Sequence, residues 1–165
     1  MNRLITLILP LALFLSSASC KKDSTKIESG FTCKIDGKRW RTYSSDFKKM
    51  EDECHITKNG ESIFIKAVNT NSLEHFSILV ESPGKIVTEG VYALNSDRYF
   101  YGSYRAPDVG DLITGNGYEG QIEIIKIDKE NSRIIGKFNY TCHSDLTKQS
   151  RTITEGQFNI MYYNF

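Results

Sequence analysis

The chain contains 165 residues, of which 39% are hydrophobic and 25% are charged, and 21 lysines and arginines stand against 20 aspartates and glutamates. The length fits a single domain, and ordinary hydrophobicity with almost no net charge excludes a disordered chain. The charge balance also argues against nucleic-acid binding, which needs an excess of basic residues to replace the counterions on phosphates. With 3 prolines and 12 glycines, the chain is not of low complexity.

Residues 1–19 have the organisation of a bacterial secretory signal peptide. Arg3 precedes an apolar stretch, residues 4–15, which is shorter than the roughly 20 residues that a membrane-spanning helix needs. Small residues then lead directly into Cys20. This order resembles the lipobox of bacterial lipoproteins, and the resemblance implies cleavage before Cys20 and acylation of its thiol and its new amino group. The alternative is an ordinary signal peptide followed by an incidental cysteine.

Residues 20–30 are predicted to be the lipidated cysteine and a flexible tether, because residues 21–30 are polar and show no periodicity. Lys21 stands where an aspartate retains some lipoproteins at an inner membrane. Its presence favours a lipid-anchored protein of the outer membrane, and the sequence leaves open whether the protein faces the periplasm or the cell surface.

From Phe31 onward the dominant period is two, as expected for strands with one buried face. Residues 31–35 alternate in this way, and Asp36-Gly37 suits a tight hairpin turn. Residues 39–43 then return with Trp40 pointing inward.

The rest of the chain repeats this pattern. A second hairpin is predicted to turn at Asn59-Gly60, and the expected strands are residues 54–58, 61–68, 75–81, 90–94, 98–104, 118–127, 134–142 and 151–163. The inward candidates of the last strand are Ile153, Phe158, Ile160 and Tyr162.

Three segments lack this pattern. Residues 105–117 hold Pro107 and three glycines and are expected to form the longest ordered loop, and residues 144–150 form another. The only helical candidate is residues 45–53, where two apolar residues lie three apart.

About nine short strands joined by tight turns predict an all-β fold. Sequential hairpins favour an antiparallel β-sandwich, and a lipocalin-like closed barrel is the alternative. Since no linker follows residue 30, residues 31–165 are predicted to be a single β domain.

Several segments carry a family resemblance. They are FTCKIDGKRW at residues 31–40, GVYAL at 90–94, GQIEIIKID at 120–128, GKFNY at 136–140 and ITEGQF at 153–158. In content and order they resemble a family of small uncharacterised Bacteroidota lipoproteins. The resemblance implies an all-β extracytoplasmic domain of unknown function, and it supplies no catalytic or ligand-binding residues.

Three cysteines remain when Cys20 is lipidated: Cys33, Cys54 and Cys142. All three fall on the apolar phase of their strands. An exported protein can form disulfides. The sequence therefore allows two predictions: one disulfide among the three cysteines, or three free buried thiols. The sequence also contains no motif for a cofactor.

Other candidates for chemistry are weaker. A zinc site would need His55, His75 and His143 to meet a thiolate, without the short ligand spacings that identify such sites. Gly115 to Gly120 match G-x-G-x-x-G, but β-patterned residues follow where a dinucleotide site needs a helix. Asp108 and Asp111 lack the spacing of a calcium loop.

Tyrosines form the most distinctive candidate surface. Tyr99, Tyr101 and Tyr104 lie close together in the sequence, and tyrosine offers a flat contact area with a polar tip. They are predicted either to bind a sugar or a peptide or to pack across strands.

The leading functional hypothesis is therefore a membrane-anchored extracytoplasmic lipoprotein with a non-catalytic binding or scaffolding domain. Its partners would be the membrane, through the lipid, and an envelope protein or glycan. One alternative is a hydrolase acting on envelope or polysaccharide polymers, and another is a lipocalin-like carrier of a small apolar ligand.

Overall fold

The chain folds into β-strands throughout the part that the structure describes. The structure is a computed structural model and describes residues 27–42, 52–57, 59–95 and 98–164. Within these residues there is no helix, and so none that could cross a membrane. The strands are β1 (Gly30–Ile35), β2 (Lys38–Arg41), β3 (Asp52–Ile56), β4 (Ser62–Asn69), β5 (Glu74–Glu81), β6 (Gly90–Leu94), β7 (Phe100–Ala106), β8 (Gly110–Ile113), β9 (Gly120–Asp128), β10 (Arg133–His143) and β11 (Ser150–Asn164).

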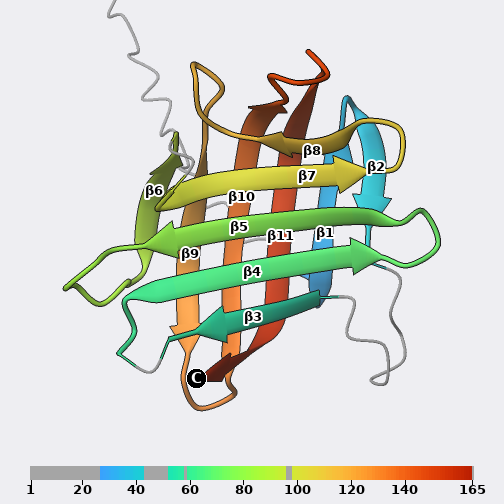
Figure 1. The fold of residues 1–165 in the computed structure, drawn as a ribbon. Coiled ribbons are helices and arrows are strands. Elements are labelled where there is room, and N and C mark those ends of the chain that lie inside the picture. Colours follow the sequence, from blue (N-terminus) through green and yellow to red (C-terminus); the bar gives the residue numbers. More distant parts are fainter. Residues whose placement is uncertain (1–26, 43–51, 58, 96–97, 165) are drawn as a thin grey trace, which may run out of the picture.

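The strands lie in two layers that face each other (Figure 1). One layer has the order β2-β1-β11-β10-β9-β6, the other has the order β3-β4-β5-β7-β8, and the strands of the two layers cross at a steep angle in the view. The all-β prediction is confirmed, with eleven strands described instead of about nine.

Hydrogen bonds join the two layers at two corners. The end of β11 pairs with β3 in parallel, and His143 of β10 pairs with Ile113 of β8. The pairing therefore makes one continuous mixed sheet. The described strand pairs are antiparallel, as predicted, except at the β11–β3 corner, which is parallel. There the long last strand extends beyond its hairpin partner and pairs with the edge of β3.

The first predicted hairpin is confirmed. Asp36 and Gly37 both have positive φ angles, of 47° and 81°, which is the backbone shape that a two-residue hairpin turn needs. Trp40 on the returning strand pairs with Cys33 and is buried, as expected.

The predicted loop at residues 105–117 is partly wrong. β7 extends to Ala106, a short turn follows, and Gly110–Ile113 form β8 with Leu112 fully buried. The glycines and the proline on either side hide a strand of only four residues from sequence patterning.

Some sequence predictions lie outside the described residues. These are the signal peptide, Cys20 and the first part of the tether, together with residues 45–51 of the helical candidate. The last two residues of that candidate, Asp52 and Glu53, begin β3.

Aromatic rings fill the space between the layers. Phe31 lies 4.7 Å from Phe138 between ring centroids, and Trp40 lies 4.5 Å from Phe76. The four inward candidates of β11 are all buried, as predicted. The space between the two layers is therefore filled with packed side chains.

Candidate functional site

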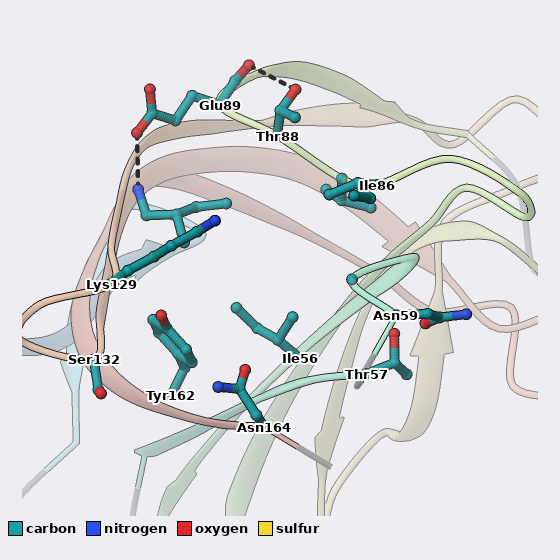
Figure 2. A pocket seen from close by; sticks show the side chains of 13 residues that line it. Ile56, Thr57, Asn59, Ile86, Thr88, Glu89, Lys129, Ser132, Tyr162 and Asn164 are labelled. Atoms are coloured by element: carbon teal, nitrogen blue, oxygen red, sulfur yellow. Dashed lines mark hydrogen bonds between the residues drawn. The ribbon is translucent and has the colours of Figure 1, made fainter.

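A pocket of about 820 Å³ opens at the end of the domain where β11 finishes (Figure 2). Four segments far apart in the sequence form it: the β3–β4 turn, residues 86–89 before β6, the β9–β10 turn and the last residues of β11. The volume is within the range of about 300–1,000 Å³ that is usual for small-molecule sites.

The pocket has an apolar floor and a polar rim. Ile56, Val87, Ile127 and Tyr162 supply the floor, whereas Ile86 stands at the edge and is 70% exposed. The polar lining residues are mostly uncharged: Thr57, Asn59, Thr88, Ser132 and Asn164, with Glu89 and Lys129 as the charged exceptions. An apolar surface bordered by a few polar groups is typical of a binding site for small molecules.

Hydrogen bonds hold residues 87–89 in place across the pocket. The Val87 N–H donates to the Gly60 carbonyl at 2.8 Å, and the Glu89 Oε1 accepts from the Ile127 N–H at 3.0 Å. The Tyr92 hydroxyl accepts from the Thr88 N–H and donates to the Thr88 carbonyl, at 3.1 Å and 2.8 Å. The wall of the pocket is therefore held in place by hydrogen bonds within the protein.

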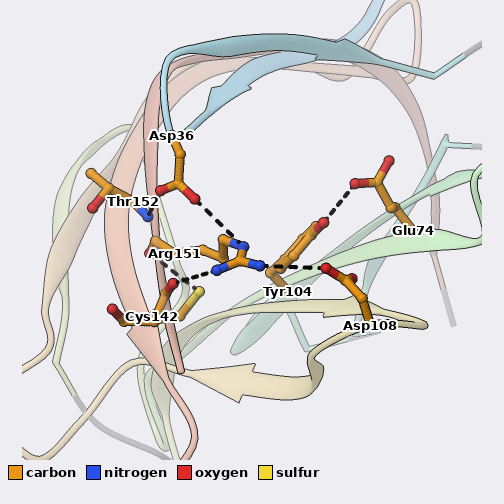
Figure 3. A network of polar contacts seen from close by, with 8 residues as sticks. Asp36, Glu74, Tyr104, Asp108, Cys142, Arg151 and Thr152 are labelled. Atoms are coloured by element: carbon orange, nitrogen blue, oxygen red, sulfur yellow. Dashed lines mark hydrogen bonds and ion pairs between the residues drawn. The ribbon is translucent and has the colours of Figure 1, made fainter. Parts of the chain in front are cut away.

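A polar network occupies the opposite end of the domain (Figure 3). Glu74 accepts from the Trp40 indole at 2.8 Å and from the Tyr104 hydroxyl at 2.5 Å. Beside them the Arg151 guanidinium lies 3.5 Å from both Asp36 and Asp108. These contacts tie β2, β5, β7 and β11 together, so we assign the network a structural role in closing this end.

Tyr104 belongs to that network and is not a surface residue. Its side chain is 4% exposed and packs against Phe76. Burial, and then the hydrogen bond to Glu74, raises the pKa of its hydroxyl above the usual range.

The predicted surface of three tyrosines is corrected accordingly. Tyr99 and Tyr101 are half-buried, and Arg98 lies 4.9 Å over the ring of Tyr99. Along β7 the even-numbered residues point into the core, and side chains alternate between faces. Tyr104 and Tyr101 therefore lie on opposite faces of the sheet, with Tyr104 on the core face.

Cys33, Cys54 and Cys142 are buried and free, so the structure has no disulfide among them. Cys33 on β1 and Cys142 on β10 flank β11 from opposite sides, since Asn159 pairs with a residue of each strand. Two strand spacings place β1 and β10 about 10 Å apart, which by itself exceeds the usual Cα separation of a disulfide. The two cysteines also lie opposite different positions along β11. Cys54 pairs with Tyr162 at the far end of β11.

The three histidines are on different strands and do not form a common site. His55 lies 3.5 Å from Glu53, His143 stacks on Tyr118 with ring centroids 4.4 Å apart, and His75 of β5 pairs with Arg105 of β7. No group of three His, Cys, Asp or Glu side chains in the described ranges is placed to hold a metal ion.

Asp108 and Asp111, considered above as calcium ligands, have different partners. Asp111 forms a bidentate ion pair with Arg105, and the hydrogen bond from Arg105 is the main cause of the lowered pKa of its carboxyl group. Asp108 instead faces Arg151. The G-x-G-x-x-G segment is a turn leading into β9, as the sequence predicted.

Sequence reasoning missed the pocket itself. Its apolar residues Ile86 and Val87 lie in a segment with no strand periodicity, between Gly84 and Gly90. A pair of large apolar residues in a glycine-flanked loop was the one available signal.

The fold and the pocket define an all-β domain with a partly apolar pocket at one end. The chain belongs to the family described as Domain of unknown function (DUF6252), whose family model matches residues 28–161. This confirms the expected membership of an uncharacterised domain family. No match was found among curated proteins or among solved structures.

Proposed function

We propose that this chain is a lipid-anchored, non-catalytic binding domain of the bacterial outer membrane, and that the end pocket binds a small, partly apolar ligand. The observation that carries the proposal is the pocket of about 820 Å³ with its apolar floor and mostly uncharged rim. The anchor is inferred from the signal sequence and Cys20.

The pocket supports binding more than hydrolysis. Glycoside hydrolysis needs two carboxyl groups facing one bond, and Glu89 is the one carboxylate among the described lining residues. Its Oε1 already accepts a backbone hydrogen bond from Ile127, which suits a residue that holds the wall in place. Among the alternatives, a carrier of a small ligand is therefore favoured over a hydrolase.

Filling the pocket is expected to abolish ligand binding. Asn164 lies at the exposed end of β11 beside Tyr162 (Figure 2), so Asn164→Trp puts a large ring into the mouth without entering the core. The test is to screen a library of small partly apolar compounds by ¹H–¹⁵N NMR of the mature protein. Binding compounds should shift the resonances of pocket residues in the native protein and leave those of this variant unchanged.

Met161→Trp is the matched control. Met161 lies on the same strand and is 44% exposed, but it points to the opposite sheet face. This variant should keep native binding. The proposed site is refuted when active compounds shift only residues around Tyr99 and Tyr101, or when none shifts the pocket.

Lipidation is expected to depend on Cys20 alone. Cys20→Ala should abolish incorporation of labelled palmitate in cells, because the acylated thiol is missing. Cys33→Ala should keep full labelling, since Cys33 is buried in the core. Intact mass spectrometry checks both variants, and palmitate on the Cys20→Ala protein would contradict a lipid anchor at this residue.

A further inference from the structure

The chain enters the domain at the pocket end. The Ile27 carbonyl accepts from the Asn159 amide at 3.0 Å, and Arg133 donates to the Ser29 hydroxyl at 2.9 Å. Arg133 directly follows Ser132, which lines the pocket and whose carbonyl accepts from the Tyr162 N–H at 2.9 Å. The tether therefore arrives next to the residues that form the pocket.

The reach of the tether brings this end close to a bilayer. The stretch from Cys20 to Ile27 spans at most about 25 Å when fully extended. If Cys20 carries the lipid, Ile27 stays within about 25 Å of the membrane surface. The pocket end, where Ile27 enters the domain, is then close to the bilayer as well.

Apolar side chains are exposed at the same end. Ile86 is 70% exposed on the pocket edge, and Met161 and Tyr163 are 44% and 40% exposed on either side of Tyr162. Met161 and Tyr163 lie on the outer face of β11 and Ile86 on the pocket edge, so apolar side chains are exposed on more than one face of this end, and such exposed groups are typical of a membrane or partner contact. Together with the tether, they favour a pocket that opens toward lipid.

One cation lies over the apolar floor. Lys129, in the β9–β10 turn, extends above Tyr162 (Figure 2) and has no ion-pair partner among the described residues. The carboxylate of Glu89 is held at the upper edge by the Ile127 N–H. An anionic group on a ligand would therefore find an unpaired ammonium group next to an apolar surface.

We propose that the pocket takes a fatty acid from the adjoining bilayer, with the acyl chain on Ile56, Val87 and Tyr162 and the carboxylate paired with Lys129. This inference rests on the proposed function, because it uses the same pocket and the lipid anchor. It adds the chemical class of the ligand and its source.

Photolabelling in a membrane tests the proposal. The mature acylated protein is placed in phosphatidylcholine nanodiscs with a 16-carbon fatty acid that carries a diazirine at its end, and adducts are mapped by mass spectrometry. We expect adducts on the pocket residues. The methyl ester of the same probe should label them about tenfold less, because it lacks the charge that pairs with Lys129.

Two charge variants identify the role of Lys129. Lys129→Gln should reduce labelling by the fatty acid about tenfold and leave labelling by the ester unchanged. Lys137→Gln is the matched control, since Lys137 is exposed on the middle of β10 outside the pocket, and it should behave like the native protein.

Several outcomes would overturn the inference. Adducts confined to Met161 and Tyr163 would mean membrane contact only, and equal labelling by the ester would remove the role of the anion. Equal labelling by a diazirine phosphatidylglycerol would replace the fatty acid by a two-chain lipid. Labelling that arises only in Cys20→Ala would mean that the protein's own acyl group fills the pocket.

Failure of this inference is distinguishable from failure of the proposed function. If the NMR experiment shows small compounds in the pocket but the fatty acid leaves no adduct there, the fatty-acid proposal is refuted and the proposed binding function is supported. When neither experiment finds a pocket ligand, both are overturned.

Discussion

Raising the pH from 8 to 11 is expected to unfold the domain. Burial raises the pKa of all three described thiols above their ordinary value of 9.0, that of Cys142 to about 12 and those of Cys33 and Cys54 further. Above pH 9 the unfolded chain therefore loses protons that the folded chain keeps, so the free energy of unfolding falls as the pH rises.

The expected effect is large. Each protected thiol contributes a slope of about 1.4 kcal/mol per pH unit, so three thiols together lower the free energy of unfolding by about 4 kcal/mol per unit. Two units of pH would then remove as much as a typical domain's total stability of about 5–15 kcal/mol. Tyr104 and Tyr140, whose pKa values burial also raises, add to the loss above pH 10.

Urea unfolding followed by circular dichroism between pH 8 and pH 11 measures this slope. Cys54→Ala should reduce the slope by about a third, because it removes one of the three thiols. A slope that is unchanged in this variant, or a free energy of unfolding that does not vary above pH 9, would contradict the protection of the thiols.

Replacing Gly136 by alanine is expected to destabilise the domain by about 3 kcal/mol or more, at the upper end of the cost of overpacking a core. A Cβ atom at this position would lie 2.3 Å from the Glu123 carbonyl oxygen and 2.3 Å from Cζ of Phe158. Phe158 pairs with Gly136 across β10 and β11 and is fully buried. The ring cannot move away without disturbing the core, and the carbonyl belongs to the neighbouring strand.

Gly84→Ala is the control for this prediction. A Cβ atom at Gly84 meets nothing within 4 Å, but φ is +76°, so the expected cost is only the backbone strain of about 1–2 kcal/mol. Urea denaturation of the two variants measures the difference. A loss at Gly136 no larger than that at Gly84 would refute the close approach of β9, β10 and β11.

Most strands could be predicted because their alternation depends on neighbouring residues in the chain. Ser62–Asn69 and Glu74–Glu81 alternate between the core and the surface as their sequences do. β8 was missed because four residues between glycines carry too little pattern. The alternation also bears on Tyr104: its even-numbered position in β7 separates it from Tyr99 and Tyr101.

The pocket could not be predicted in the same way. Ile56, Val87, Ile127 and Tyr162 come from four segments, and nothing in their separate surroundings indicates that they share a cavity. The parallel pairing of Tyr162 with Cys54 brings two of these segments together, and such a pairing depends on the whole sheet.

By itself, the sequence determined the all-β class, the hairpin at Asp36-Gly37 and the inward faces of the strands, because period and turn chemistry are local properties. Only the tertiary structure decided which ends of the strands meet, that Trp40 and Tyr104 share Glu74 at one end, and that a pocket with Lys129 opens at the other. The physical reason is that contacts between distant segments depend on how the two layers cross and where their corners close.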